Sequence, residues 1–291
     1  MQKVLLLGNP TEHSLSPAFQ QAAFDHVHLP WQYRTATVET SELPSVVALM
    51  RSGEIAGANV TIPHKTAIMP FLDELASSAK EIGAVNTIQI ITGKRRTQLI
   101  GHNTDIDGVK SSITTQDVTM ESSIASVIGN GGASLAVIAG LQSLGVKKIH
   151  LLGRNIANVQ EVIDRGWVTE IIPHDLTSIS TSELTGLLIE STVIVQATSV
   201  GMTGGSAPNQ SPIPNAVLES ALNKSTLQQL LFDLVYSPIN TPFLNTIHNM
   251  NVVGINGLEM LLRQGAAAFE IWTTQTAPIE IMRASLKEAA I

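Results

Sequence analysis

Short hydrophobic runs alternate with longer amphipathic segments along most of the chain. The runs are rich in Val, Ile and Leu and are bounded by Gly, Asn, Ser or Pro, which is the pattern of buried strands. The segments between them follow a helical period. This alternation predicts βαβ units and an α/β fold with mainly parallel sheets. The predicted strands cover residues 4–7, 31–38, 55–60, 85–91, 126–128, 148–152, 193–196 and 230–235.

Capping and turn residues refine this pattern. Ser16 followed by Pro17 predicts a capped helix start with proline at the first helical position. Residues 40–44 contain the same types of residue and predict another helix start. A turn at Thr92-Gly93-Lys94, between two extended runs, predicts a hairpin and therefore an antiparallel element in the first half.

A polar segment separates two α/β regions. A helical stretch ends after Asp107, and a new strand begins near Ser123. We therefore expect two domains, at residues 1–108 and 109–255, followed by two helices within residues 256–291. We expect these helices to pack on the first domain, although periodicity alone does not show it.

Composition narrows the class of protein. The 291 residues are 44% hydrophobic and 14% charged, no apolar run approaches the ~18 residues of a membrane helix, and no signal peptide is present, so we expect a soluble cytoplasmic protein. The lack of cysteine excludes disulfides and a cysteine nucleophile. A net charge of −7 without a long basic run argues against a nucleic-acid partner and favours a small molecule. The histidines are scattered and predict no metal site; we expect a monomer or homodimer.

A glycine-rich turn follows the predicted strand at residues 126–128. Gly129, Gly131 and Ser134 match the spacing G-x-G-x-x-G/A/S between a strand and a helix. Gly129 would allow a tight turn, Gly131 the close approach of backbone to a pyrophosphate, and the small Ser134 close packing of helix on strand. The phosphates would lie at the helix N-terminus. The alternative is a glycine-rich turn that binds nothing.

The next predicted strand ends in Gly153-Arg154-Asn155, without the acidic residue that reads the ribose in NAD enzymes. A planar guanidinium suits a 2′-phosphate in charge and geometry, so Arg154 favours NADP over NAD. The alternative is an exposed arginine on a loop.

A lysine lies shortly after the predicted strand at residues 55–60. Pro63 is best tolerated in the first turn of a helix, which would place Lys65 near a helix N-terminus. Partial burial and the helix dipole would both disfavour the ammonium form there and suit the side chain to proton transfer. Taken alone, a lysine at a helix start is usually only solvated.

Two further polar clusters, at residues 83–87 and 101–105, lie at strand ends in the same half. Ligands of open α/β sheets bind outside the carboxyl ends of the strands, so Asn59, Asn86 and Asp105 could face one crevice. Asp105 could also cap the helix that begins near residue 106.

Taken together, eight ordered motifs over most of the chain resemble the signatures of the shikimate dehydrogenase family. They are Ser14-Leu-Ser16-Pro17, Asn59-Val-Thr61-Ile-Pro63-His64-Lys65, Gly83-Ala84-Val85-Asn86-Thr87, Asn103-Thr104-Asp105-x-x-Gly108, Gly129-x-Gly131-Gly132-Ala133, Ala197-Thr198-Ser199-Val200-Gly201-Met202, Asp233-x-Val235-Tyr236-x-Pro238 and Gly257-x-x-Met260-Leu261-x-x-Gln264-Gly265. The resemblance implies a two-domain enzyme that reversibly reduces 3-dehydroshikimate to shikimate with NADPH, in chorismate and aromatic amino acid biosynthesis. An α/β substrate domain would come first and a Rossmann-type NADP-binding domain second.

The resemblance also implies roles for individual residues. Lys65 and Asp105 would form the proton-transfer pair at the hydroxyl being oxidised, and hydride would pass to the nicotinamide without a protein nucleophile. Ser14 and Ser16 would hold the substrate carboxylate. The carboxylate or the ring hydroxyls would also be bound by Asn59, Thr61, Asn86, Tyr236 and Gln264.

On the cofactor side, the resemblance implies that the loop from Thr198 to Met202 lines the nicotinamide and that Gly254 makes a backbone contact. The expected NADP(H) contacts are Gly129, Asn130, Gly131, Gly132, Ala133, Ser134, Gly153, Arg154, Asn155, Thr198, Ser199, Met202, Val235, Gly254 and Met260.

The chain departs from the family pattern at three places. Gln20 and Gln21 stand where the family usually carries His-Asn, and Gly153 and Asn155 replace the usual neighbours of Arg154. Asn256 and Glu259 stand where the family commonly has Asp and a small residue. These departures leave open a quinate/shikimate or aminoshikimate dehydrogenase-like enzyme with altered substrate or NAD use. A non-catalytic NADP-binding regulatory protein is a third hypothesis, since fold alone does not establish function.

Overall fold

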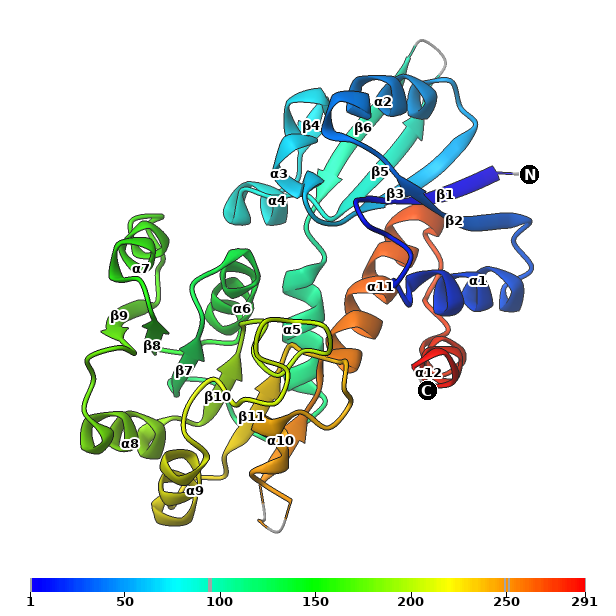
Figure 1. The fold of residues 1–291 in the computed structure, drawn as a ribbon. Helices are drawn as coiled ribbons and strands as arrows, with labels where there is room; N and C mark the ends of the chain where they lie inside the picture. Colours follow the sequence, from blue (N-terminus) through cyan, green and yellow to red (C-terminus); the bar gives the residue numbers. More distant parts are fainter. Residues whose placement is uncertain (1, 94–95, 249, 251, 291) are drawn as a thin grey trace. The chain divides into compact units, whose positions relative to one another are not determined.

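The structure is a computed structural model that describes residues 2–93, 96–248, 250 and 252–290. The chain divides into two compact units (Figure 1), with Met1–Gly108 and Leu261–Ile291 in unit 1 and Val109–Met260 in unit 2. The first break falls at residue 108. The second falls inside a helix, so residues 256–260, which we expected with the C-terminal helices, are grouped with unit 2.

Unit 1 is built on a mixed six-stranded sheet with the order β2-β1-β3-β5-β6-β4. Its strands are β1 (Gln2–Gly8), β2 (Trp31–Thr37), β3 (Ile55–Val60), β4 (Glu74–Leu75), β5 (Thr87–Thr92) and β6 (Thr97–His102). The first three are parallel, whereas β5 runs antiparallel to both β3 and β6. Thr92 pairs with Thr97, so the predicted hairpin is present. Lys94 of its predicted turn lies outside the described residues.

Helices and short 3₁₀ turns surround this sheet in unit 1. They are α1 (Ser16–His26), η1 (Thr40–Glu42), α2 (Leu43–Arg51), α3 (His64–Ala67), η2 (Met69–Phe71), α4 (Ser77–Ile82) and α12 (Ile279–Ala289), together with parts of α5 (Asp105–Thr114) and α11 (Gly257–Thr273). In α2, for example, Leu43, Val47 and Met50 repeat at the helical period and are all buried in one core with Leu7 and Ile88. Helix α12 packs against α1.

Unit 2 is built on a parallel six-stranded sheet with the order β12-β11-β10-β7-β8-β9. Its strands are β7 (Ile124–Ile128), β8 (Lys148–Gly153), β9 (Glu170–Asp175), β10 (Val193–Gln196), β11 (Leu230–Asp233) and β12 (Val253–Ile255). Its own helices are α6 (Gly132–Ser143), α7 (Ile156–Ile163), α8 (Thr181–Glu190), α9 (Asn215–Lys224) and α10 (Pro242–Asn245). The predicted α/β class with mainly parallel sheets is confirmed. Within the described ranges, no helix is long and apolar enough to span a membrane.

The two strands of unit 2 that the sequence pattern missed lie at the edges of its sheet. β9 contains Pro173 and polar residues, and β12 has only three residues. An edge strand is covered on fewer sides than a central one and tolerates proline, so it lacks a continuous apolar run.

Candidate active site

Three polar segments of unit 1 meet at one edge of its sheet. Asn59 lies near the carboxyl end of β3, and Asp105 follows the carboxyl end of β6. Asn86 instead precedes β5, but β5 is antiparallel to both neighbours, so its amino end lies at the same edge. The structure therefore brings the three residues together, although the argument from parallel strand ends does not account for Asn86.

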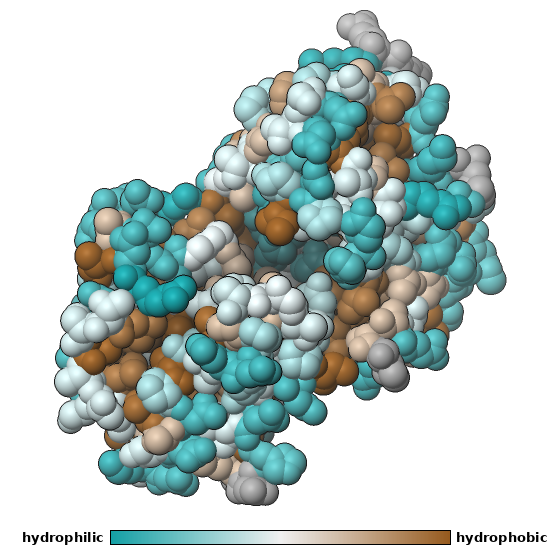
Figure 2. All heavy atoms as spheres, viewed as in Figure 1, coloured by the Kyte–Doolittle hydropathy of each residue, from teal (hydrophilic) through white to brown (hydrophobic). Residues whose placement is uncertain are grey.

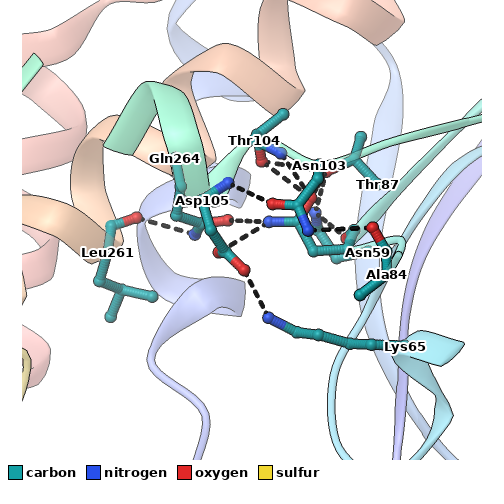
Figure 3. A network of polar contacts seen from close by, with 10 residues as sticks. Asn59, Lys65, Ala84, Thr87, Asn103, Thr104, Asp105, Leu261 and Gln264 are labelled. Carbon is teal, nitrogen blue, oxygen red and sulfur yellow. Dashed lines mark hydrogen bonds and ion pairs between the residues drawn. The ribbon is translucent and has the colours of Figure 1, made fainter. Parts of the chain in front are cut away.

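An ion pair joins Lys65 to Asp105. The Nζ of Lys65 lies 2.6 Å from Oδ2 of Asp105, and the side chains are 32% and 17% exposed. The Nδ2 of Asn86 donates to the other carboxylate oxygen, Oδ1, at 2.8 Å. Figure 3 shows the ammonium group of Lys65 pointing at the Asp105 carboxylate. The carboxylate is thus held from two sides and orients the ammonium group beside it.

The side-chain amide of Asn86 has only one possible orientation. Its Oδ1 accepts hydrogen bonds from the N–H of Thr104 at 2.8 Å and from the hydroxyls of Thr104 and Thr87 at 3.1 and 3.0 Å. A backbone N–H can only donate, so the amide oxygen must face it and Nδ2 must face Asp105. Sequence analysis gave the buried Thr87 and Thr104 no role, because the two threonines meet at the Asn86 oxygen only when the segment of Thr104 folds against that of Asn86.

Helix α5 begins at Asp105 itself. The Oδ1 of Asn103 accepts a hydrogen bond from the Asp105 N–H at 3.1 Å, and Asn103 also donates to the carbonyl of Ala84 at 3.0 Å. The prediction that Asp105 caps the helix is therefore wrong, because Asn103 makes the capping contact. The Asp105 carboxylate lies in the first turn, where the helix dipole favours a negative charge, and it is available to Lys65.

Sheet contacts fix the segment that carries Lys65. The Thr61 N–H donates to the carbonyl of Leu7 at 2.8 Å, and the Val85 N–H donates to the carbonyl of Lys65 at 2.8 Å. Pro63 takes the N-cap position of the four-residue α3, one residue before its predicted place in the first helical turn, and Lys65 lies near the helix N-terminus as predicted. Lys65 is therefore placed by hydrogen bonds of its segment to β1 and to the loop before β5.

Gln264 reaches the same group from helix α11 (Figure 3). Its Nε2 donates to the carbonyl of Leu261 at 2.9 Å, and its Oε1 faces Nδ2 of Asn86 at 3.5 Å. The Nδ2 of Asn86 therefore donates one hydrogen to Asp105 and the other to Gln264.

The serines of the first motif stand at the start of α1. Ser16 is the first helical residue, Leu15 takes the N-cap position, and Pro17 lies in the first turn. Ser14 Oγ accepts the Ser16 N–H at 3.2 Å. The prediction that Ser16 caps the helix is wrong, because Ser14 makes this contact.

Asn59 is buried and fully paired within unit 1. Its Oδ1 accepts a hydrogen bond from the Tyr33 hydroxyl at 2.7 Å, and its Nδ2 donates to the Asn86 carbonyl and to the Thr87 hydroxyl, both at 3.1 Å. Both hydrogens of the amide are used. In this structure Asn59 supports its neighbours and has no N–H left for a ligand.

Gln20 and Gln21, which depart from the family pattern, belong to the framework of unit 1. Gln20 is fully buried and donates to the carbonyl of Gly265 at 2.8 Å. Gln21 accepts the Tyr33 N–H at 3.0 Å and donates to the Trp31 carbonyl at 3.1 Å, as a neighbouring strand would. These contacts hold α1 against α11 and β2, so the two residues act as structural supports.

In unit 2, the glycine-rich turn lies between β7 and α6. Gly129 has φ +114°, and a Cβ there would lie 2.9 Å from the Ala197 carbonyl oxygen. A Cβ at Gly131 or Gly132 would meet nothing within 4 Å, so the backbone is open on this side. Gly131 is the N-cap of α6, which has no side-chain cap, and Ser134 is buried in its first turn. An open helix N-terminus with small residues fits the pyrophosphate of a dinucleotide.

The loop after β8 is tied to this turn. Asn130 donates to the Asn155 carbonyl at 3.1 Å, and the Asn155 side chain caps α7 by accepting the N–H groups of Ala157 and Asn158. A Cβ on Gly153 would lie 2.6 Å from Val159. These contacts fix the loop after β8 to the glycine-rich turn. Arg154 is part of this loop.

Arg154 is exposed beside a cavity of about 220 Å³. Thr177, Thr181 and the apolar residues Leu176 and Ile213 also line it. In Figure 2, brown hydrophobic residues gather at the lower left over the region of α8 and α9. Apolar walls suit an adenine ring, and a guanidinium at the rim suits a phosphate, so the donor set of this cavity fits the adenosine end of NADP(H).

Two buried side chains at strand ends shape the remaining loops of unit 2. Oε1 of Gln196 accepts the Thr198 N–H at 2.6 Å and its Nε2 donates to the Val200 carbonyl at 2.8 Å, which holds the loop that contains Ser199 and leads to Met202. The Asp233 carboxylate accepts the Val235 N–H at 2.9 Å. Sequence analysis missed both roles, although each residue ends an apolar run with a polar side chain.

Three other expected site residues also belong to unit 2. Tyr236 is half-buried, and burial raises the pKa of its hydroxyl, so the group is protonated and can donate a hydrogen bond at neutral pH. Gly254 lies in β12, and Met260 lies in α11 at the end of unit 2. Within the part of the chain that the structure describes, no group of His, Cys, Asp and Glu could hold a metal ion.

Burial makes unit 2 sensitive to pH through Asp233. Burial raises the pKa of this carboxyl to about 6, although hydrogen bonds from Thr241 (2.6 Å) and Val235 lower it. A raised pKa stabilises the folded state below the ordinary value of 3.8, and this contribution is lost as the pH rises through 6. The free energy of unfolding of the wild type, minus that of Asp233→Asn, is expected to fall by about 2 kcal/mol between pH 4 and pH 7.

Urea unfolding of both proteins at several pH values measures this difference. Asp175→Asn is the control, because hydrogen bonds from Thr177 lower the pKa of the half-buried Asp175 and its contribution has the opposite sign. A constant difference between wild type and Asp233→Asn across this range would contradict the prediction.

The glycine-rich turn in a parallel sheet, together with an ordered lysine and carboxylate in the other unit, defines the class of dinucleotide-binding α/β proteins that is typical of nicotinamide-dependent oxidoreductases. The family model described as "Shikimate dehydrogenase substrate binding domain" matches residues 6–88, and the one described as "Shikimate 5'-dehydrogenase C-terminal domain" matches residues 257–287. A shikimate dehydrogenase (NADP(+)) of Desulforamulus reducens is 39% identical over 284 residues, which cover 96% of this chain and 92% of the relative. The chain belongs to the shikimate dehydrogenase family, and the family resemblance of its motifs is confirmed.

Solved structures show the same fold. Shikimate 5-dehydrogenase from Listeria monocytogenes, in complex with shikimate and NAD, has a TM-score of 0.87 and 29% sequence identity, with 98% of this chain and 96% of that chain covered. The 5-ketofructose reductase of Gluconobacter sp. has a TM-score of 0.83 and 26% identity, with 99% and 98% covered. The fold is therefore shared by proteins whose names state different substrates.

Proposed function

We propose that this chain reversibly reduces 3-dehydroshikimate to shikimate with NADPH. The observation that carries the proposal is the ordered group of Lys65, Asp105, Asn86 and Gln264 in unit 1 of a chain that belongs to this family. Unit 1 would be the substrate domain and unit 2 the NADP-binding domain. The curated relative is named for the same reaction and the same cofactor.

Lys65 is the group placed to carry the proton. In the oxidative direction the substrate hydroxyl gives its proton to the Lys65 amine, and in the reductive direction the ammonium group returns it to the carbonyl oxygen. Asp105, at 2.6 Å, keeps Nζ aimed and offsets its positive charge. When bound, NADP(H) supplies the exchange of hydride with the carbinol carbon.

Neutral polar groups would recognise the rest of the substrate. We propose that Ser14 and Ser16 bind the carboxylate, with Thr61 and Tyr236 as further donors, and that Asn86 and Gln264 bind ring hydroxyls. A substrate that leaves one of these groups without a hydrogen bond would have a lower kcat/KM. This preference favours a polyhydroxy acid. Asn59 acts by supporting these groups, since its own amide is already paired.

The NADP(H) contacts that we propose are those of the three loops of unit 2. The pyrophosphate would lie on Gly129, Asn130, Gly131, Gly132, Ala133 and Ser134, and the adenosine end on Gly153, Arg154 and Asn155. The nicotinamide side would meet Thr198, Ser199, Met202, Val235, Gly254 and Met260.

Steady-state kinetics test the proposal directly. NADPH formation is measured with shikimate and with quinate, each with NADP and with NAD, and 5-ketofructose is offered with NADPH in the reverse assay. We expect the highest kcat/KM for shikimate with NADP. A higher kcat/KM with quinate, with NAD or with 5-ketofructose would show that the chain catalyses a different reaction. NADP binding without turnover would indicate a regulatory protein.

Arg154 is expected to decide the choice of cofactor. Arg154→Ala removes the charged donors from the rim of the cavity, and losing such a hydrogen bond costs about 1.5–3 kcal/mol. We therefore expect KM for NADP to rise about 10- to 100-fold while KM for NAD stays within about twofold. Lys224→Ala, which removes an exposed cation at the end of α9, is the control. An equal change for both cofactors would show that Arg154 does not read the 2′-phosphate.

A further inference from the structure

Gln20 lies where α1 meets α11, and both helices carry residues of the proposed substrate site. Its side chain is fully buried, and its Nε2 donates to the Gly265 carbonyl at 2.8 Å. A Cβ on Gly265 would collide with the ring of Phe19, so the lack of a side chain there allows the two helices to approach this closely. Ser16 lies on α1 one turn before Gln20, and Gln264 immediately precedes Gly265 on α11.

A second contact between the two helices defines their register. The rings of Phe24 and Phe269, both fully buried, stack with their centroids 5.6 Å apart. Phe24 follows Gln20 by four residues, and Phe269 follows Gly265 by four residues. Both helices therefore advance by about one turn between the two contacts, and they run in the same general direction along this interface.

The same register leads back to the groups of the substrate site. One turn before the contact of Gln20 with Gly265, Ser16 on α1 and Leu261 on α11 lie toward the same end of the interface. The carbonyl of Leu261 accepts a hydrogen bond from Nε2 of Gln264 at 2.9 Å. The contact that Gln20 makes thus bears on how far Ser16 stands from Gln264.

Only half of the Gln20 amide is paired. Its Oε1 is buried and has no hydrogen-bond partner among the residues that the structure describes. A buried acceptor without a partner destabilises the folded state, which offsets what the hydrogen bond to Gly265 contributes. An apolar side chain of the same length would fill this space without that cost, so stability alone does not account for an amide here.

We propose that Gln20 is a positioning residue, whose hydrogen bond to Gly265 sets the separation between Ser16 and Gln264. The proposal rests on the proposed function, which gives Ser16 the substrate carboxylate and Gln264 a ring hydroxyl. Gln264 has an N–H for this contact, because its amide carries two hydrogens and Leu261 accepts one of them. The two groups would bind different parts of one rigid ring, so their separation selects the acid that satisfies both.

Gln20→Met tests the proposal, since it removes the donor and the unpaired oxygen and keeps the length of the side chain. We expect KM for shikimate to rise about tenfold, kcat to stay within about threefold and KM for NADP to be unchanged, because a displaced Gln264 loses about one substrate hydrogen bond. The urea midpoint should stay close to that of the wild type, because the unpaired oxygen is lost together with the hydrogen bond. An unchanged KM for shikimate would overturn the proposal.

Gln21→Met is the matched control on the same helix. Gln21 accepts the Tyr33 N–H at 3.0 Å and donates to the Trp31 carbonyl at 3.1 Å, so its contacts hold β2. We expect this variant to lower the urea midpoint and to leave KM for shikimate unchanged. KM does not depend on the fraction of folded enzyme, so the pair of variants separates positioning from stability. A KM that rises equally in both variants would contradict the assignment to Gln20.

A double-mutant cycle tests whether the effect passes through Gln264. In a Gln264→Ala protein the displaced group is absent, so adding Gln20→Met should change KM for shikimate by less than about twofold. A rise of about tenfold in both backgrounds would show that Gln20 acts on another part of the protein, against the proposal.

A measurement without substrate separates this proposal from the proposed function. The side-chain amide signals of Gln264 in NMR spectra, identified by their loss in Gln264→Glu, report the surroundings of this group in the free protein. We expect these signals to move in Gln20→Met and to keep their positions in Gln21→Met. Signals that do not move in Gln20→Met would refute the role of Gln20. A wild type that fails to oxidise shikimate, although the signals move, would refute only the proposed function.

Discussion

Replacing Lys65 by alanine is expected to lower kcat for shikimate oxidation by about 100- to 10,000-fold, the usual contribution of a positioned proton-transfer group. The variant keeps Asp105 and its hydrogen bond from Asn86, so the sheet edge stays folded, but no amine remains to take the hydroxyl proton. KM for NADP should change little, since Lys65 is not among the proposed NADP(H) contacts, which all belong to unit 2. The assay is NADPH formation at saturating shikimate and NADP.

The control for this experiment is Lys80→Ala, which removes an exposed lysine from α4 of the same unit. Asp105→Asn gives a second test, because it keeps the shape of the side chain and an acceptor for Asn86 but removes the charge that holds Nζ at 2.6 Å. We expect it to lower kcat more than it raises KM. A Lys65→Ala protein that is folded and retains a tenth or more of the wild-type kcat would show that another group transfers the proton.

Replacing Gly257 by alanine is expected to destabilise unit 2 by about 3 kcal/mol or more, the upper part of the range for overpacked sites. A Cβ at this position would lie 2.1 Å from the Leu234 carbonyl oxygen and 2.7 Å from its carbon. Both are backbone atoms next to the end of β11, and they have little freedom to move because Gly257 N–H also donates to the Val235 carbonyl at 3.1 Å. Urea unfolding followed by circular dichroism measures the loss.

Gly186→Ala is the matched control, since a Cβ at this exposed position in α8 would meet nothing within 4 Å. Alanine is favoured over glycine in a helix by about 0.5–1 kcal/mol, so this variant should be slightly more stable than the wild type. If Gly257→Ala has the same urea midpoint as the wild type, the end of β11 and the start of α11 can move apart without a loss of stability, which would contradict the prediction.

Residues that depart from a family motif need not change its chemistry. Gln20 and Gln21 follow the first signature of this chain, and from the sequence they leave the substrate open. In the structure they bind main-chain groups of Gly265, Trp31 and Tyr33. A long amide side chain can reach a carbonyl on another element, and which carbonyl lies within reach depends on how α1 packs.

The sequence by itself determined the features that depend on neighbouring residues. Apolar runs bounded by turn residues located the central strands of both sheets, and the spacing of Gly129, Gly131 and Ser134 located the turn into α6. Eight motifs in order were enough to identify the family. These signals are local, because strand burial, tight turns and helix starts are each set within a few residues.

Only the tertiary structure decided how the site is held together. The antiparallel direction of β5 brought Asn86 to the edge where Asp105 lies, Thr104 fixed the direction of the Asn86 amide, and Tyr33 on β2 bound Asn59 on β3. Each of these contacts links residues that are well separated along the chain. A side-chain hydrogen bond requires a distance near 3 Å and a matching donor and acceptor, and residue type and spacing along the sequence do not specify which distant groups the fold brings within that distance.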